Sequence, residues 1–260
     1  MFRFLQTRRD DAVEYLTLYR PEVRNAFNDE VVAELQQWAD TIAGDDNVRV
    51  VVIAGAGKVF SAGADAAWMA RMADASEADN ERDALATTAM LGAINRLPVV
   101  VIGRVHGVAL GGGAGLAAVC DVVIAEEATV FGFTETRLGI LPAMISPFVL
   151  PKIGLSAARA LFLTATRFDA AHARAIGLVH TVVPASELDA VVAACVHEAL
   201  SAAPTAVAAA KALIPQVVGR HPDEVAALTA RIIAAQRVSP EGQEGLRAFL
   251  DKRQPGWVVA

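Results

Sequence analysis

Cysteine is scarce in this chain. Only two of the 260 residues are cysteines, Cys120 and Cys195, and they lie far apart in the sequence. Two distant cysteines cannot form a disulfide framework, and neither they nor the five histidines show the spacing of a metal-binding motif. We therefore interpret both cysteines as small buried hydrophobes and expect no metal site.

Clusters of basic residues are also missing. The formal net charge is −6, and the short pair Arg8-Arg9 is followed at once by two aspartates. Because binding to a phosphate backbone depends on clustered lysine and arginine, the sequence predicts no nucleic-acid partner.

Long hydrophobic runs are absent as well. The apolar runs, of which residues 98–101 are an example, are all too short to span a bilayer. The first residues alternate like a β-strand and lack the apolar core and cleavage site of a signal peptide. We therefore expect a cytoplasmic protein with no membrane partner.

Small aliphatic residues are abundant. Hydrophobic residues make up 54% of the chain and aromatic residues only 6%, and the surplus lies in alanine and valine. Residues 48–54 form an apolar run interrupted only by Arg49, and such a run is typical of a strand buried on both faces of a helix-covered sheet. We expect an α/β fold with strands at 12–19, 48–54, 98–104, 122–125 and 130–133, and helices at 28–43, 65–97 and 110–118.

The order of the expected elements repeats as strand, strand, helix, which suggests stacked ββα turns. Beyond Pro184 the chain becomes alanine-rich and helical, with expected helices at 186–202, 204–218, 222–238 and 240–252. We divide the chain into a ββα core, residues 1–195, and a carboxyl-terminal helical region, residues 196–260. This region has little polar cover, so we expect it to pack on neighbouring subunits.

Two glycine-rich turns are the main candidates for chemistry. Phe60-Ser61-Ala62-Gly63-Ala64-Asp65 and Leu110-Gly111-Gly112-Gly113-Ala114-Gly115 each lead from an expected strand into a helix. Either turn alone is more often a packing feature. Together they could present two backbone N–H groups to one oxygen that becomes negative during a reaction. About twenty residues after the second turn stands one acid, Glu135.

Several motifs together make the chain resemble the crotonase (enoyl-CoA hydratase/isomerase) superfamily from end to end. They are RPEVRNAFNDE (20–30), FSAGAD (60–65), RVHGVALGGGAGLAAVCD (104–121), FGFTETRLGILP (131–142), TRFDAAHARAIGLVHTVVP (166–184) and FLDKRQPGW (249–257). The resemblance implies a crotonase-like spiral of ββα turns with a carboxyl-terminal helical trimerisation region, and assembly as a homotrimer or homohexamer.

The resemblance also implies roles for single residues. The N–H groups of Ala64 and Gly112 would form an oxyanion hole for the thioester oxygen of an acyl-CoA. Glu135 matches one of the two glutamates of the family's hydratases, whereas Gly115 stands where the other would be. A single base can still move a proton while an ordered water supplies the hydroxyl. Without the resemblance, Glu135 could equally be a surface acid paired with Arg137.

Further residues fall at positions that bind substrate or coenzyme A in the family. Asp65 is in addition a strong candidate for a helix cap, and His106 for a histidine bonded to backbone. No separate cofactor is expected, because coenzyme A is part of the substrate. The positions implied for binding are Arg24, Ala62, Asp65, Ala66, Trp68, Gly111, Gly115, Phe249 and Lys252.

Residues 60–83 and 139–154 look most like bacterial methylglutaconyl-CoA hydratases of leucine catabolism, a subgroup that also carries glycine at the position of Gly115. The resemblance predicts reversible hydration of 3-methylglutaconyl-CoA to 3-hydroxy-3-methylglutaryl-CoA. A cation could bind the distal carboxylate of this substrate, and Arg71, Arg82 and Arg137 are candidates. Gly115 would leave room for the branched acyl group.

Two alternatives remain. An enoyl-CoA isomerase, or a general enoyl-CoA hydratase, could also work with the single acid Glu135. A relative that binds RNA, or another interaction protein without catalysis, is disfavoured by the negative charge.

Overall fold

The computed structural model describes residues 2–258 and consists of two compact units, one ending at Ala194 and the other beginning at Cys195. The division falls within helix α7 (Leu188–Ser201). The first unit contains both sheets, and the second contains the following helices. The expected α/β class is confirmed, and the proposed trimerisation by the second unit stays a prediction.

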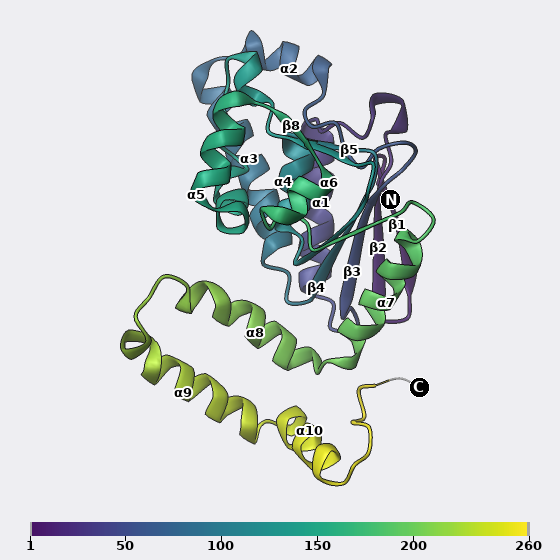
Figure 1. Cartoon of the computed structure of the whole chain (residues 1–260), viewed down its shortest axis with the longest axis vertical. Helices are drawn as coiled ribbons and strands as arrows, with labels where there is room; N and C mark the ends of the chain where they lie inside the picture. Colours follow the sequence, from purple (N-terminus) through teal and green to yellow (C-terminus); the bar gives the residue numbers. More distant parts are fainter. Residues whose placement is uncertain (1, 259–260) are drawn as a thin grey trace. The chain divides into compact units, whose positions relative to one another are not determined.

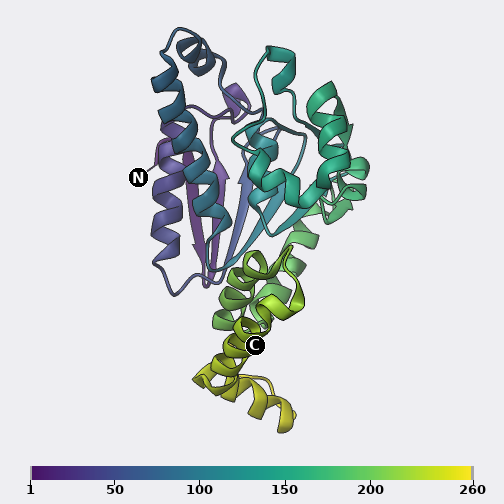
Figure 2. The ribbon, with the colours of Figure 1, turned by 90° about the vertical axis from the view of Figure 1, so that its left-hand side faces the viewer.

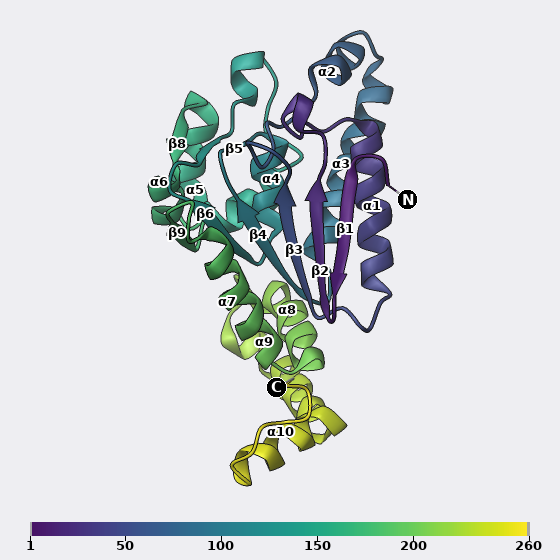
Figure 3. The same ribbon diagram turned by 90° about the vertical axis from the view of Figure 1, so that its right-hand side faces the viewer.

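The main sheet has six strands in the order β1-β2-β3-β4-β6-β9 (Figure 3). β1 is antiparallel to β2, and every later neighbour is parallel. The central strands consist largely of valine and isoleucine because helices and loops bury them. The strands are β1 Leu5–Asp10, β2 Val13–Leu18, β3 Val50–Gly55, β4 Val100–Val105, β6 Val122–Glu126 and β9 Thr181–Val183.

A second, three-stranded sheet carries the catalytic candidates. Its order is β5-β7-β8, with β5 parallel and β8 antiparallel to β7. β5 leads directly into the second glycine-rich turn, and β7 ends three residues before Glu135. Its strands are β5 Val108–Leu110, β7 Val130–Gly132 and β8 Arg167–Asp169.

Helices α1 and α3 cover one face of the main sheet (Figure 2), and α4 packs against α3 and α5. In the described part of the first unit, the helices preceding α7 are α1 Asp29–Ala43, α2 Ala66–Ala73, α3 Glu77–Asn95, α4 Gly112–Val119, α5 Ser146–Thr164 and α6 Ala170–Ala175. Two short 3-10 helices are η1 Pro21–Val23 and η2 Glu135–Leu138. Helices α5 and α6 and strands β8 and β9 were not anticipated from the sequence.

Residues 65–97, expected to be mainly helical, form two helices rather than one. The chain breaks after α2, and Ser76 caps the start of α3 by accepting a hydrogen bond from the Asp79 N–H (3.2 Å). A capped start satisfies backbone donors that would otherwise be lost at a break, so two helices replace one.

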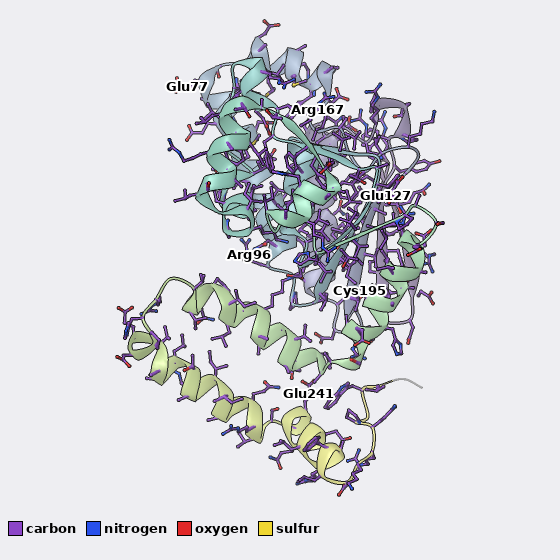
Figure 4. The ribbon with its side chains drawn as sticks, in the orientation of Figure 1. Glu77, Arg96, Glu127, Arg167, Cys195 and Glu241 are labelled. Atoms are coloured by element: carbon purple, nitrogen blue, oxygen red, sulfur yellow. The ribbon has the colours of Figure 1, made fainter. Side chains whose placement is uncertain are left out.

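The second unit is built from the end of α7 and helices α8 Pro204–Val217, α9 Pro222–Val238 and α10 Pro240–Leu250 (Figure 1). Glu241 on α10, labelled in Figure 4, accepts hydrogen bonds from the Thr205 N–H (3.0 Å) and Ala206 N–H (2.9 Å) at the start of α8. A carboxylate at this end complements the helix dipole. Large apolar side chains nevertheless remain exposed here, including Val238, Phe249 and Leu250.

Within residues 2–258, no single helix has both the length and the apolar composition needed to cross a membrane. By those two criteria alone, the bent pair formed by α7 and α8 passes.

Candidate functional site

The two glycine-rich turns lie in direct backbone contact. The Ser61 N–H donates to the Val108 carbonyl (3.0 Å), and the Leu110 N–H donates to the Ser61 carbonyl (3.1 Å). Gly63 has φ +94°, and a Cβ there would lie 2.8 Å from the Leu110 carbonyl oxygen. Only glycine can occupy this position without moving the second turn.

The Ala64 N–H belongs to the first turn. Its neighbours pair with Phe27, which donates to the Gly63 carbonyl (2.7 Å) and accepts from the Asp65 N–H (2.8 Å). Successive N–H groups in an extended segment point to opposite sides, so the N–H of Ala64 is directed away from Phe27. Among the described residues it has no hydrogen-bond partner.

The Gly112 N–H lies at the start of α4. Gly111, with φ +49°, turns the chain into this helix and donates its N–H to the Gly132 carbonyl (2.9 Å). The first N–H groups of a helix have no partner within it. No described residue accepts from the Gly112 N–H, so both predicted oxyanion donors are available to a ligand.

Glu135 opens η2 and its carboxyl group lies against the second turn. Its Oε1 atom is 3.2 Å from the position that a Cβ would occupy on Gly111. Its Oε2 atom is buried and has no hydrogen-bond partner in residues 2–258. Burial raises the pKa of Glu135 above its ordinary value, because the ionised form loses hydration. The structure therefore places a carboxyl group with a raised pKa against the turn that carries the Gly112 N–H.

Glu135 makes no ion pair with Arg137 within the described chain. The alternative reading of Glu135 as a surface acid paired with this arginine is therefore wrong, since the glutamate side chain is largely withdrawn from solvent. The Arg137 side chain is exposed on the same short helix and likewise carries no ion pair there.

Gly115 does not leave open space, contrary to our expectation. A Cβ on this buried residue would lie 2.2 Å from Cγ2 and 2.9 Å from Cβ of Ile145. Ile145 is itself 2% exposed. An apolar side chain from the segment before α5 thus fills the volume into which a second glutamate would project.

Asp65 caps α2, as the sequence predicts. One carboxylate oxygen accepts from the N–H groups of Ala67 (2.9 Å) and Trp68 (3.1 Å), and the other accepts from Arg20 (3.0 Å). Burial alone would raise the pKa of Asp65, but these hydrogen bonds and the guanidinium charge hold it below its ordinary value. The carboxylate is therefore ionised and structural.

Other residues predicted to bind coenzyme A surround the first turn. The Ala62 N–H donates to the Arg24 carbonyl (2.9 Å), and the Arg24 side chain is exposed beside it. Ala66 is exposed at the start of α2. Trp68 is instead buried and donates its indole N–H to Asp83 (3.2 Å), so its contact with a ligand through that group is blocked.

Phe249 and Lys252 belong to the second unit, at and just after the end of α10. Both side chains are exposed, and the Lys252 N–H donates to the Phe249 carbonyl (3.2 Å). Their contact with coenzyme A stays a prediction.

The three cations considered for a distal carboxylate differ in their partners. Arg71 pairs with Asp29 (2.6 Å), and Arg82 pairs with Asp79 on the same helix. Arg137 is the candidate that makes no ion pair with any residue from 2 to 258, and it stands two residues from Glu135.

Two buried polar residues were missed from the sequence. Asn25, with φ +53°, donates to the Ala56 and Val59 carbonyls (2.8 Å each) and so holds the loop before the first turn. Ser61 donates to the Asn25 carbonyl (2.8 Å) and accepts from the Gly63 N–H (3.2 Å). Both residues lie inside motifs that carry the family resemblance, and this was the available signal.

His106 has the expected structural role, with Nε2 3.0 Å from the Gly57 carbonyl. It also lines a groove of about 1410 Å³ along β1 and β2, which does not include Glu135 or the glycine-rich turns. No cluster of three or more potential metal ligands occurs in residues 2–258.

Comparison with known proteins agrees with this geometry. The family model described as enoyl-CoA hydratase/isomerase matches residues 8–259. A Thermus thermophilus protein named as an enoyl-CoA hydratase is 34% identical, with 94% of this chain and 96% of that protein covered. A crystal structure of an enoyl-CoA hydratase from Shewanella pealeana is 34% identical, with TM-score 0.95 and coverage of 98% and 96%. An enoyl-CoA hydratase/isomerase from Marinobacter aquaeolei is 35% identical, with TM-score 0.93 and coverage of 98% and 99%.

Proposed function

Because the chain belongs to the enoyl-CoA hydratase/isomerase family, we propose that its substrate is 3-methylglutaconyl-CoA and its product 3-hydroxy-3-methylglutaryl-CoA. The family and its relatives support a general enoyl-CoA hydratase function and hence an acyl-CoA substrate. The observation that carries the proposal is the buried carboxyl of Glu135 beside Gly111, next to the unpaired N–H group of Gly112.

The proposed reaction begins with the thioester oxygen accepting hydrogen bonds from the Ala64 and Gly112 N–H groups. Water then bonds through oxygen to C3 and gives a proton to the Glu135 carboxylate, while the double-bond electrons move onto the thioester oxygen as an enolate. The enolate collapses when Glu135 returns that proton to C2. One carboxyl group thereby handles both transfers, and its raised pKa makes it a stronger base than an exposed glutamate.

Two features support the specific substrate. Ile145 fills the volume into which a second acid would project from α4, so an apolar side chain replaces a charge that would repel a dicarboxylic acyl group. Arg137 is exposed, unpaired among the described residues and close in sequence to Glu135, so it is available for the distal carboxylate. The motifs in residues 60–83 and 139–154 favour the same subgroup.

An enoyl-CoA isomerase is the second candidate, and the single acid favours it. In that reaction Glu135 would take a proton from C2 of a 3-enoyl-CoA and return it to C4 as the double bond moves. No water would be incorporated.

Mass spectrometry of the products separates these functions. We expect 3-methylglutaconyl-CoA to gain the mass of one water, faster than crotonyl-CoA does, and Glu135→Gln to abolish the gain. Isomerisation of a 3-enoyl-CoA without any water gain from either 2-enoyl thioester would replace the hydratase proposal by the isomerase. Equal rates for the two 2-enoyl thioesters would leave a general hydratase.

We further propose a cytoplasmic homotrimer or homohexamer that uses no cofactor apart from the coenzyme A of its substrate. The exposed apolar side chains of α9 and α10 support assembly, because such surfaces commonly pack on another subunit.

A further inference from the structure

The Arg20 guanidinium is a buried charge just after β2. Its side chain is 12% exposed, and it lies over the Phe4 ring with 4.7 Å between the guanidinium carbon and the ring centroid. One terminal nitrogen donates to Asp65 (3.0 Å) and the other to the Ala26 carbonyl (2.6 Å). A buried charge is costly unless its partners are well placed, so this arrangement calls for a reason.

Both acceptors flank the same backbone bridge. Ala26 immediately precedes Phe27, and Asp65 immediately follows Ala64, and Phe27 and Ala64 form the bridge described above. The rigid Arg20 guanidinium therefore binds the residue before Phe27 on one side of the bridge and the residue after Ala64 on the other. The Ala26 carbonyl and the Phe27 N–H belong to one planar peptide unit, and this N–H donates to the Gly63 carbonyl (2.7 Å). The Gly63 carbonyl shares its own peptide unit with the Ala64 N–H, so the hydrogen bond from Arg20 to Ala26 restricts the direction of the Ala64 N–H through two successive peptides.

The Asp65 carboxylate links this contact to α2. Its other oxygen accepts from two N–H groups at the start of that helix, so the carboxylate ties the guanidinium, the first turn and α2 together. Loss of the arginine would leave a carboxylate that is 9% exposed without its counter-charge. The local backbone would have to shift to hydrate it.

We propose that Arg20 is a positioning residue that sets the direction of the Ala64 N–H in the oxyanion hole. Arg20 acts through Asp65 and Ala26 and makes no contact with the reacting atoms. The inference rests on the proposed role of the Ala64 N–H in binding the thioester oxygen.

Steady-state kinetics of Arg20→Met test the inference. We expect kcat to fall by about tenfold or more, with KM changed by less than about twofold. Removing one oxyanion donor lowers kcat by roughly a hundredfold or more, and a donor that points in the wrong direction should lose part of that factor. Arg9→Met is the matched control, because Arg9 also bridges two acceptors, the carboxylates of Glu14 and Asp45 (2.9 Å each), but belongs to β1. Its kcat should stay within about twofold of wild type.

A bound 3-ketoacyl-CoA allows a measurement that a general loss of protein stability would not change, namely the apparent pKa at which the ligand forms its enolate. Such a ligand can enolise, and the bound enolate is detected by its near-ultraviolet absorbance. We expect Arg20→Met to bind it yet to raise the apparent pKa for enolate formation, whereas Arg9→Met leaves that pKa unchanged. This measurement does not require turnover, so a wild type that forms the enolate but hydrates nothing would refute the proposed hydration and leave the inference on Arg20 still tested.

Asp65→Asn serves if Arg20→Met does not fold. Asparagine keeps the helix cap but loses the charge that Arg20 pairs with, so we expect the same rise in enolate pKa to a smaller extent. Folded Arg20→Met with unchanged kcat and enolate pKa, or losses equal to those of Arg9→Met, would overturn the proposal. So would an unchanged enolate pKa in Asp65→Asn.

Discussion

Gly115 and Ile145 should be coupled energetically, because they compete for one volume. The Cβ added by Gly115→Ala would approach Cγ2 of Ile145 to 2.2 Å, far inside van der Waals contact. Alanine gains about 1 kcal/mol over glycine in a helix interior, whereas overpacking costs about 1–3 kcal/mol. The balance predicts that Gly115→Ala lowers the free energy of unfolding by up to about 2 kcal/mol, where an unobstructed site would gain.

Ile145→Ala removes the Cγ2 atom responsible for the closest contact. Alone it should cost about 2–5 kcal/mol, because it empties part of a core in which Ile145 is 2% exposed. In the double variant the new methyl group on residue 115 takes up part of that space, although the 2.9 Å contact to Cβ of residue 145 must still lengthen. We expect the double variant to be more stable than the sum of the single changes predicts, by about 1–2 kcal/mol.

Urea unfolding at one fixed protein concentration measures all four proteins, since subunit association makes stability depend on concentration. Additivity within about 0.5 kcal/mol, or a Gly115→Ala variant more stable than wild type, would refute the reasoning. The same geometry applies to Gly115→Glu, which should hydrate 3-methylglutaconyl-CoA less well than crotonyl-CoA when Ile145→Ala provides the space. Equal losses on both thioesters would mean that residue 115 affects only the backbone of α4.

Four further predictions concern charge and assembly. Glu135→Gln should keep coenzyme A binding but lose at least about a hundredfold in hydration rate; near-normal turnover would remove Glu135 from the mechanism. Because burial raises the pKa of Glu135 in the folded state, the folded protein binds this proton more tightly than the unfolded chain does, and wild-type stability falls as pH rises from about 4.5 through the raised pKa. Glu135→Gln should therefore melt higher than wild type at pH 7, with a smaller difference at pH 4.5, and a lower melting temperature at pH 7 would contradict this. Hydrogen bonds from Arg253 and the Gly256 N–H lower the pKa of Glu244 to about 2. The stabilising effect of its carboxylate is therefore present above pH 4.5 and is lost as pH falls through 2. Glu244→Gln should increase the rate of proteolysis after α10 at pH 7, and an unchanged cleavage rate would show that the contact is unimportant. Light scattering at micromolar concentration should give a trimer or hexamer, and a monomeric mass would refute the assembly.

The parts of the fold that follow a local pattern could be predicted from the sequence. The apolar run of β3 and the helical pattern of α1 are both set by neighbouring residues, and the structure places these elements within two residues of expectation. The break between α2 and α3 also had a local signal, because Ser76 and Asp79 have the spacing of a helix start, but the surrounding helical pattern masked it.

The parts of the site that depend on contacts between distant segments could not be predicted. Ile145 meets Gly115 across thirty residues, and Arg20 meets Asp65 across forty-five, so neither contact leaves a periodic trace. Motif resemblance located the two turns and Glu135. It gave no indication of the side chain that replaces the second acid or of the buried arginine behind the first turn.

Helix α4 is buried over every residue from Gly113 to Val119. Its backbone amides should therefore be among the slowest to exchange with deuterium, since opening this helix requires the surrounding core to open. The Gly112 N–H lies at the start of this helix, so its position is set by the packing of the whole core rather than by any one side chain nearby. Mild substitutions deep in the first unit should accordingly reduce turnover while the amount of folded protein stays unchanged. Many of the substitutions found in a screen for lost activity would then lie far from the substrate.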